Sequence, residues 1–416
     1  MTSSPSSSQA SKARAASLQV SWFFLVLVFL SWSRVGSATE PFNIPTLADD
    51  AAQAWLVTFS PGEIYFERFG HNAIWLREPA QGLDHTFNFG YFDFEQEDFF
   101  LRFMRGRMLY FSIAQPAIRE FEYYRQVNRS IRAQKLKLSP AQYQRLRDYL
   151  LNEVQPENRN YRYDYYLNNC STRIRDALDI ALNGALSART GKVPAELNFR
   201  DQTRRLTQTQ FWYYLGLETG LGMPVDRAVS RWDEMFIPMV VADEISTMSA
   251  TSTAVGEPLV EVDTMFYTST LAPPAAAPAS NWYRYLFLGL MVTALAWLSG
   301  RYMPPVWLAG LSRAWLLISA TLGMVLAGLW FLTDHEASSY NVNLLLLNPL
   351  LLLALVPRLQ RFGAALLVGG NVLAFFLLFL PTRQYNLDVI ALLGPINLAV
   401  GLYLLRAQPK ESYSVG

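Results

Sequence analysis

Cys170 is the only cysteine in the 416-residue chain and the residue best suited to act as a nucleophile. It follows Asn169, a favoured N-cap residue, and the apolar positions after it recur at helical spacing until Gly184 offers a C-terminal stop. A thiol in the first turn of this helix would meet unpaired N–H groups and the positive end of the helix dipole, which lower its pKa. Cys170 also shares a helix face with Ile174, so the alternative is a small residue of the core.

A thiol nucleophile needs a partner that takes up and returns its proton, and histidine can do both near neutral pH. The chain has three histidines. His71 follows Gly70 at the start of a predicted strand, where it could meet the first turn of a helix packed on the sheet. His85 is expected on the surface at the outer end of the next strand, and His335 in a loop between apolar segments. We therefore expect His71 to be the partner of Cys170.

The composition points to a membrane protein, because 51% of the residues are hydrophobic. The formal net charge is +1 and no dense basic cluster occurs, so nucleic acid is not expected as a partner. A single cysteine excludes an internal disulfide, and the three histidines lack any spacing that suits a metal. We expect neither a metal ion nor another cofactor.

The chain divides into an exported part and a membrane part. Residues 1–38 are typical of a secretory signal peptide, with an apolar run from Leu18 to Trp32 and small residues ending at Ala38; an uncleaved N-terminal anchor is the alternative. Residues 50–240 are expected to form the catalytic domain, and residues 241–281 a strand and a linker. Residues 282–406 are expected to form a transmembrane bundle, followed by a cytoplasmic tail, residues 407–416.

Within the catalytic domain, strands precede helices, which favours an α+β fold with a helix packed on a sheet. The alternating and β-branched runs predict three strands: Trp55–Phe59, His71–Arg77 and His85–Phe92. Helices are predicted for Phe94–Met108, for Ala141–Val154 after the N-cap Ser139, and for the segment that begins at Cys170. A short strand is predicted for Glu257–Tyr267.

The C-terminal region holds five apolar segments, which predict an all-α bundle of about five transmembrane helices. They are Trp282–Leu298, Ala314–Leu332, Asn343–Val356, Gly363–Leu380 and Leu387–Leu405. Most of the positive charges near their ends fall on one side of the proposed bundle: Arg301, Arg313, Arg358, Arg361, Arg406 and Lys410. The positive-inside rule therefore places the catalytic domain outside the cytoplasm, in agreement with the signal peptide.

Several motifs together resemble the Lnb family of lipoprotein N-acyltransferases. They are Phe69–Ala73 (FGHNA), Phe87–Phe94 (FNFGYFDF), Asn168–Asp176 (NNCSTRIRD), Trp232–Pro238 (WDEMFIP), Asn341–Leu344 (NVNL) and Asn348–Leu350 (NPL). The resemblance implies a circularly permuted papain-like, or NlpC-like, extracytoplasmic domain, because histidine precedes cysteine here and follows it in papain. It also implies a bacterial inner-membrane protein whose catalytic domain faces the periplasm.

The activity that the resemblance implies is transfer of an acyl chain between two lipid substrates. Cys170 would take the chain from a phospholipid as a thioester, and the N-terminal amine of a lipid-modified lipoprotein cysteine would then attack. His71 would serve as base and then as acid, and the backbone N–H of Cys170 would hold the oxyanion. For the residue that orients His71, papain-like spacing favours Asn88, with a polar strand residue that faces water as the alternative reading of Asn88. Pairing Arg77 with His85 would instead bring Tyr91 opposite His71 and Asp93 just beyond it.

Candidate substrate-binding residues lie near the cysteine and in the membrane part. Arg173 follows Cys170 by three residues and could bind a lipid phosphate, with a structural role as the alternative. Asn169, Asn341 and Asn343 are further candidates, the last two for a lipid head group at the outer membrane face or simply for water. The aromatic side chains of Phe94, Phe99, Phe100, Phe103 and Tyr110 are expected in the core rather than in an acyl-chain groove.

Two other functions use the same features differently. A membrane-anchored cysteine peptidase or amidase acting on cell-wall peptides would need the same pair of residues, although five spanning segments exceed what an anchor requires. A membrane-embedded binding or assembly protein would need no nucleophile, and Cys170 would then belong to the core.

Overall fold

The computed structural model describes residues 51–249 and 257–406, all of which lie in one compact unit, Ile44–Gly416. The predicted signal peptide and the predicted cytoplasmic tail lie outside the described residues. Within the described residues the chain is α+β: an antiparallel sheet with helices on it comes first, and a helical region follows.

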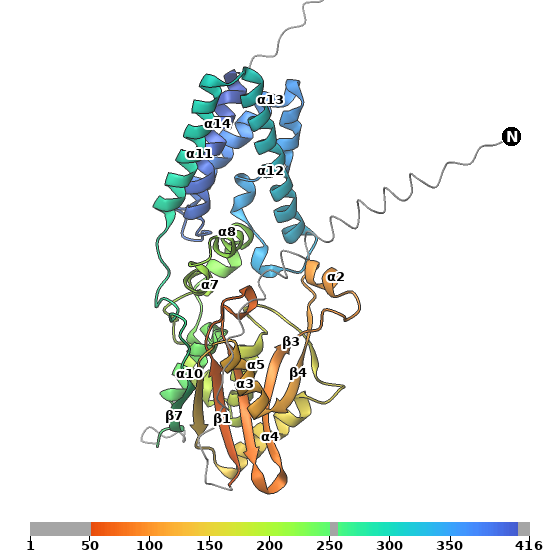
Figure 1. Cartoon of the computed structure of the whole chain (residues 1–416), viewed down its shortest axis with the longest axis vertical. Coiled ribbons are helices and arrows are strands. Elements are labelled where there is room, and N and C mark those ends of the chain that lie inside the picture. Colours follow the sequence, from red (N-terminus) through yellow and green to blue (C-terminus); the bar gives the residue numbers. More distant parts are fainter. Residues whose placement is uncertain (1–50, 250–256, 407–416) are drawn as a thin grey trace, which may run out of the picture. The chain divides into compact units, whose positions relative to one another are not determined.

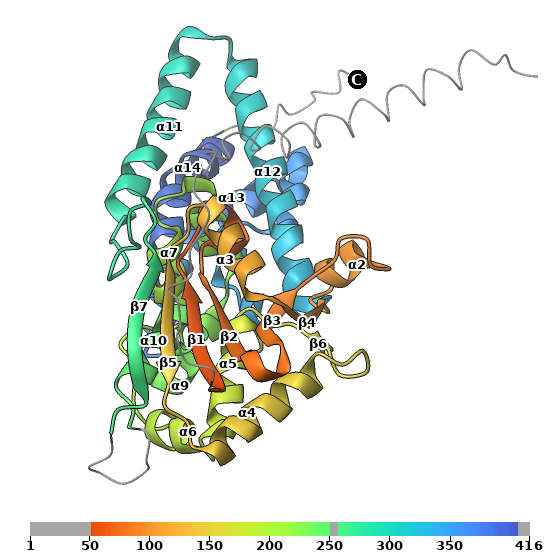
Figure 2. The same ribbon diagram turned by 60° about the horizontal axis from the view of Figure 1, so that its bottom comes forward.

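The N-terminal domain is built on one seven-stranded sheet with the order β6-β4-β3-β2-β1-β5-β7, and Figure 2 shows most of these strands side by side. Every neighbouring pair is antiparallel. The strands are β1 (Gln53–Phe59), β2 (His71–Glu78), β3 (Leu83–Tyr91), β4 (Leu109–Pro116), β5 (Ile131–Leu136), β6 (Asn160–Arg162) and β7 (Val260–Tyr267). The three predicted N-terminal strands are thus confirmed as β1, β2 and β3, with shifts of one or two residues at their ends.

Side chains of each strand alternate between the two faces of the sheet. Helices pack on both faces, so the central strands are covered on both sides. On one face Ile74 and Leu76 join the core formed with Ile174 of helix α5 (Cys170–Ala181). On the other face Phe121 of helix α3 (Ala117–Gln126) packs edge-on against Trp75, with ring centroids 5.4 Å apart. Figure 1 shows both helices beside the sheet. This packing fixes β2 and β3 between the two helices.

The remaining helices of this domain include one predicted correctly and one predicted too long. Helix α4 (Pro140–Glu153) follows the predicted N-cap Ser139, which also forms a capping box with Gln142. Helix α2 covers only Phe99–Met104, because Asp98 and Gly106 both have a positive φ, which interrupts helical geometry on either side. The others are α6 (Ala185–Thr190), α7 (Phe199–Thr207), α8 (Phe211–Gly220), α9 (Arg231–Glu234) and α10 (Pro238–Ser246).

The segment expected as a strand and linker contributes to the sheet. The predicted strand is present as β7, which pairs with β5 and forms an edge of the sheet. Helix α10 also runs past residue 240, up to Ser246. The sheet domain therefore includes residues that the sequence assigned to the following segment. The sequence predicts the strand, but it does not show that this strand pairs with β5, which lies more than 100 residues earlier in the chain.

The C-terminal region contains α11 (Trp282–Tyr302), α12 (Pro305–Phe331), α13 (Gln360–Leu377) and α14 (Leu387–Arg406). Among the described residues, three helical segments are long and apolar enough to cross a membrane: Pro305–Phe331, Pro357–Leu377 and Leu387–Arg406. The segment expected as the third spanning helix instead forms two short 3-10 helices, Val342–Leu345 and Pro349–Leu355. Asn348 and Pro349 interrupt it, since proline lacks the N–H that a continuous helix needs.

The backbone from Leu345 to Leu347 packs against two of the spanning helices, and each contact is made at a glycine of the helix. Gly323 of α12 lies directly against the backbone of Leu347, and Gly370 of α13 against that of Leu345, with no room for a Cβ. Asn397 of α14 donates a hydrogen bond to the carbonyl of Leu346 over 3.0 Å. Irregular backbone is tolerated at membrane depth only where protein satisfies its polar groups, and these contacts supply that protection.

Polar contacts join the sheet domain to the helical region. Arg204 of α7 forms an ion pair with Glu218 of α8 and donates to the carbonyl of Tyr385 over 2.7 Å. Tyr214 of α8 donates to Asp388 of α14 over 2.5 Å. These side chains are almost fully buried, so breaking one of the bonds would leave a buried polar atom without a partner. The bonds therefore hold the sheet domain against the helical region.

Candidate active site

Cys170 begins helix α5, as the sequence predicts, and Asn169 is its N-cap. The Asn169 side-chain oxygen accepts hydrogen bonds from the N–H groups of Ser171 and Thr172, both over 2.9 Å. Its amide nitrogen donates to the carbonyls of Tyr165 and Phe236. Both polar atoms of this buried side chain are therefore used to shape the turn before the cysteine, so Asn169 positions Cys170.

The thiol of Cys170 lies over the end of the sheet. A Cβ placed on Gly90 of β3 would stand 3.2 Å from the Cβ of Cys170, a tighter contact than most Cβ atoms make, so glycine favours this close approach. Burial raises the pKa of the Cys170 thiol to about 11, and the backbone N–H groups of Asn72, Ser171 and Cys170 itself offset only part of that rise. The expectation of a lowered pKa is therefore wrong, because removal from water outweighs the field of the helix N-terminus.

His71 begins β2 and is held by a chain of two hydrogen bonds. Its Nε2 lies 2.8 Å from Oδ1 of Asn88, and Nδ2 of Asn88 donates to Oε2 of Glu120 over 2.9 Å. Because Glu120 accepts from the amide nitrogen, the amide oxygen of Asn88 must face the imidazole. Nε2 then carries the proton, and Nδ1 is left free to act as a base.

Burial also sets the charge of the imidazole. The His71 ring lies beside Phe59 and Tyr124, which stack on each other, with ring centroids 5.9 Å and 6.2 Å away, and burial lowers the pKa of His71 to about 4. Both shifts favour the neutral forms of the thiol and the imidazole. This environment therefore favours transfer of the thiol proton during the reaction over a preformed thiolate–imidazolium pair.

The strand register brings Cys170 and His71 to the same end of the sheet. β2 and β3 pair with Ala73 opposite Asn88, and Arg77 lies opposite Asp84, so the alternative pairing of Arg77 with His85 is wrong. Asn72, the residue after His71, joins β2 to the start of α5. Its backbone N–H interacts with the Cys170 thiol, and its side-chain amide donates a hydrogen bond to the hydroxyl of Ser171 over 3.4 Å. Within the described residues the His71 ring bonds to Asn88 and makes no hydrogen bond to the thiol.

Three predicted substrate-binding residues have structural roles. Arg173 forms an ion pair with Glu153 over 3.4 Å and lies over the ring of Tyr161, 4.3 Å from its centroid. Asn341 and Asn343 are buried, and their amide nitrogens donate to backbone carbonyls in the last turn of α8. They cap that helix, and these bonds give them a structural role beside the predicted contact with a lipid head group.

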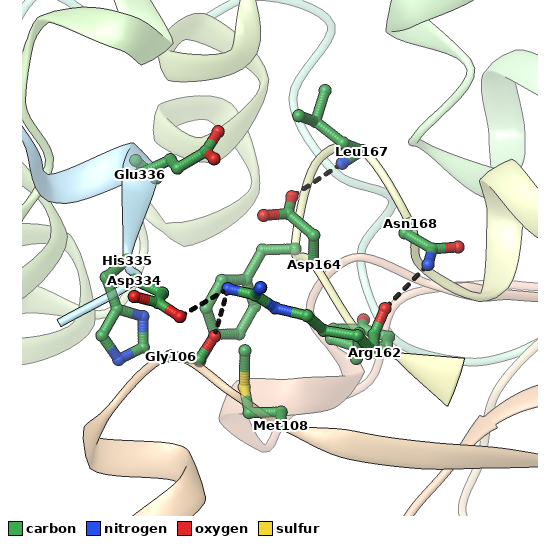
Figure 3. A pocket seen from close by; sticks show the side chains of 12 residues that line it. Gly106, Met108, Arg162, Asp164, Leu167, Asn168, Asp334, His335 and Glu336 are labelled. Atoms are coloured by element: carbon green, nitrogen blue, oxygen red, sulfur yellow. Dashed lines mark hydrogen bonds and ion pairs between the residues drawn. The ribbon is translucent and has the colours of Figure 1, made fainter. Parts of the chain in front are cut away.

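A hollow of about 260 Å³ lies near the cysteine, where the sheet domain meets the loop after α12. Tyr163 and Tyr165 form part of its wall, and Arg162, Asp334, His335 and Glu336 supply charged or polar groups (Figure 3). Tyr163 also approaches Gly90, the residue against which Cys170 packs. Tyr163 therefore lies both in the wall of the hollow and beside the glycine against which Cys170 packs. In the part of the chain that is described, no three His, Cys, Asp or Glu side chains are grouped to hold a metal.

Two family models match the chain, and they cover both of its parts. Residues 42–214 match the Lnb N-terminal periplasmic domain, and residues 276–405 match the Lnb transmembrane domain. The chain belongs to the Lnb family. No curated protein and no solved structure matches it.

Membership of the Lnb family indicates an enzyme of the membrane that processes lipoproteins, with its N-terminal domain in the periplasm. In this Lnb protein the periplasmic domain carries His71, Asn88 and Cys170, and the transmembrane domain carries the candidate spans. Sequence reasoning missed Glu120 and the role of Gly90. The glycine stands inside the motif Phe87–Phe94, where a positive φ could have been suspected, whereas nothing in the sequence connects Glu120 to Asn88.

Proposed function

We propose that this Lnb protein is a lipoprotein N-acyltransferase that works through a thioester on Cys170. The observation that carries the proposal is the arrangement of Cys170 at a helix N-terminus beside β2 and β3, where Glu120 and Asn88 hold His71 with Nδ1 free. Family membership adds a lipoprotein substrate, and the attached membrane domain adds access to phospholipid.

The first half-reaction forms the thioester. Nδ1 of His71 takes the thiol proton while the sulfur attacks an ester carbonyl of a phospholipid. The backbone N–H groups of Cys170 and Asn72 lie close to the sulfur. There they would stabilise the negative charge that develops on the carbonyl oxygen. When the tetrahedral intermediate collapses, the C–O bond breaks and the lysophospholipid oxygen takes the proton from His71.

The second half-reaction transfers the chain to nitrogen. The N-terminal amine of a lipid-modified lipoprotein cysteine attacks the thioester carbonyl, and His71 takes a proton from that amine. The C–S bond then breaks, the proton returns to the sulfur, and an amide is released with Cys170 restored. No other reactant is required, so the cycle balances with one phospholipid and one lipoprotein consumed.

The proposal includes the finer points of fold and location. We propose that the periplasmic domain is a circular permutation of the papain-like fold, since the histidine strand precedes the cysteine helix. We also propose that α11 and the segment 342–355 complete a five-part membrane domain with the three candidate spans, in a bacterial inner membrane. A cysteine peptidase acting on cell-wall peptides would use the same residues, but it would not need this membrane domain.

Mass spectrometry of a lipoprotein N-terminus tests the proposal in cells. In a strain that depends on this protein, the N-terminal cysteine should carry an amide-linked acyl chain, and the Cys170→Ala variant should leave its amine free. Cys170→Ser and His71→Ala, each checked for normal membrane insertion, should give the same free amine. An N-acylated lipoprotein in the Cys170→Ala strain would contradict the proposal.

A further inference from the structure

Helix α2 and the turn before it expose a cluster of large apolar side chains, which we call the α2 surface. Its members are Phe94, Phe100, Leu101, Phe103 and Met104. Phe100 is 68% exposed and Met104 is 60% exposed, so the expectation that the aromatic residues of this segment are core is wrong for Phe94, Phe100 and Phe103. Such a cluster is unfavourable in water and marks a surface that contacts something apolar.

The α2 surface is fixed beside the end of a candidate membrane span. The N–H of Asp334 donates to the carbonyl of Arg105 over 2.8 Å, and the ring of His335 bonds to the carbonyl of Phe103 over 2.9 Å. Asp334 follows α12 by three residues, and Leu332 at the end of that helix is 82% exposed. A spanning helix ends where the hydrocarbon ends, so the α2 surface lies at the depth of the lipid interface.

The charges on α2 match that interface. Arg102, Arg105 and Arg107 line a second hollow of about 260 Å³ together with Asp98 and Leu101. Arg107 pairs with Asp334, whereas the guanidinium groups of Arg102 and Arg105 have no side-chain partner among the described residues. Apolar side chains beside unpaired arginines are typical of an element that lies in a lipid leaflet, with its cations at the phosphates.

A continuous row of aromatic rings leads from α2 towards the nucleophile. Phe92 lies 5.9 Å from Phe99 and 5.1 Å from Tyr110, measured between ring centroids. Tyr110 in turn stacks on Tyr163 at 4.2 Å, and Tyr163 approaches Gly90 beside Cys170. These rings form one continuous packed layer that joins α2 to the residues beside the thiol.

We propose that the α2 surface inserts into the periplasmic leaflet, that Arg102 and Arg105 bind phospholipid phosphates there, and that the aromatic row guides the acyl chain to Cys170. The insertion and the phosphate contacts stand independently of the acyl-transfer chemistry, whereas the guiding role rests on the proposed function. The occupant is phospholipid, because the surface continues that of a membrane-spanning helix and combines hydrocarbon-like and cationic groups.

Spin labelling of the full-length protein in vesicles tests the insertion. Because Cys170 is the only cysteine, the double variant Cys170→Ser, Phe100→Cys can be labelled with a nitroxide at position 100 alone. The labelled protein is placed in vesicles of phosphatidylcholine and phosphatidylglycerol. We expect the label to be relaxed by oxygen and protected from a water-soluble nickel chelate. Ile180→Cys, an exposed apolar position at the other end of α5, is the matched control and should be open to nickel.

Two results would overturn the insertion. Nickel access at position 100 equal to that at position 180 would place α2 in water, and protection from both reagents would show that protein covers the surface. Adding Arg102→Gln and Arg105→Gln should move the label towards water. Unchanged protection after both substitutions would show that the arginines do not bind phosphate.

Paired acyl donors test the guiding role. Phe100→Ser with Met104→Ser should slow acylation of Cys170 from vesicle phospholipid and leave acylation from a water-soluble short-chain thioester unchanged. Equal loss with both donors would place the defect at the thiol and overturn the guiding role. If the unaltered protein takes an acyl chain from neither donor while position 100 remains in lipid, the proposed function fails and the insertion stands.

Discussion

Gly90 and Cys170 are packed so closely that a Cβ on the glycine would stand 3.2 Å from the Cβ of the cysteine. Gly90 also has a φ of +92°, a conformation that side chains other than glycine rarely adopt. Both the backbone of β3 and the start of α5 therefore depend on the absence of a side chain at this position.

Gly90→Ala should reduce activity more than it reduces stability. The new methyl group must push Cys170 away from the sheet by a few tenths of an ångström. We therefore expect a loss of rate smaller than the roughly 100-fold that a displacement of about 1 Å can cost. Acyl transfer in vesicles and thermal unfolding in detergent measure the two effects. Gly82→Ala, at another glycine with positive φ but with open space around it, is the matched control and should retain activity. Equal activity of the two variants would contradict this role of Gly90.

Glu120 should act through Asn88 on the proton position of His71. Without the Glu120 carboxylate, the amide of Asn88 can rotate. The hydrogen bond between Nε2 of His71 and Oδ1 of Asn88, which keeps the proton on Nε2 and leaves Nδ1 unprotonated, would then be lost. General acid–base catalysis supplies about 10²- to 10⁴-fold, so we expect Glu120→Ala to lower kcat by roughly 10- to 100-fold with little change in KM. Glu120→Gln keeps an oxygen that can accept from Asn88 and should restore most of the rate. If both variants instead raise KM and leave kcat intact, Glu120 does not position the base.

The resting thiol should react slowly at neutral pH. Because burial raises the pKa of Cys170 to about 11, only about one molecule in 10⁴ carries a thiolate at pH 7. The rate of alkylation by iodoacetamide should therefore climb steadily from pH 7 to pH 10. Peptide mapping after timed alkylation measures it. A plateau below pH 8 would mean that the resting site already holds a thiolate.

Asn343 should matter for stability and not for lipid choice. Its amide donates to the carbonyls of Glu218 and Thr219, and its oxygen accepts from Asn386. Asn343→Ala leaves these buried groups unpaired at a cost of about 1 to 3 kcal/mol, which thermal unfolding in detergent would detect. Asn158→Ala, at an exposed position, is the control. A changed preference among phospholipid head groups at unchanged stability would restore Asn343 as a lipid contact.

Local sequence signals predicted the elements that hold the site. The N-cap Asn169 and the apolar positions after Cys170 located α5, and the alternating runs located β1, β2 and β3. These features depend on residues within a few positions of one another, so the sequence contains the needed information. The family resemblance, which both family models bear out, rests on the same local motifs.

Properties that depend on distant residues escaped the sequence. The register between β2 and β3 decides that Asn88 faces His71, and Glu120 joins them from α3, a helix that was not predicted. Burial determines the pKa of Cys170, and burial follows from packing. The apolar residues of α2 illustrate a different limit, since a core and a membrane surface select the same side chains, and only the structure shows which of them are exposed.

The most direct test of the central claim is the mass of the Cys170 peptide after full-length protein is incubated with phospholipid vesicles and quenched in acid. We predict one added acyl chain on Cys170, no such adduct in His71→Ala, and loss of the adduct when a lipopeptide with a free N-terminal amine is supplied. An unmodified Cys170 peptide under these conditions, or an adduct that forms equally fast without His71, would contradict the account.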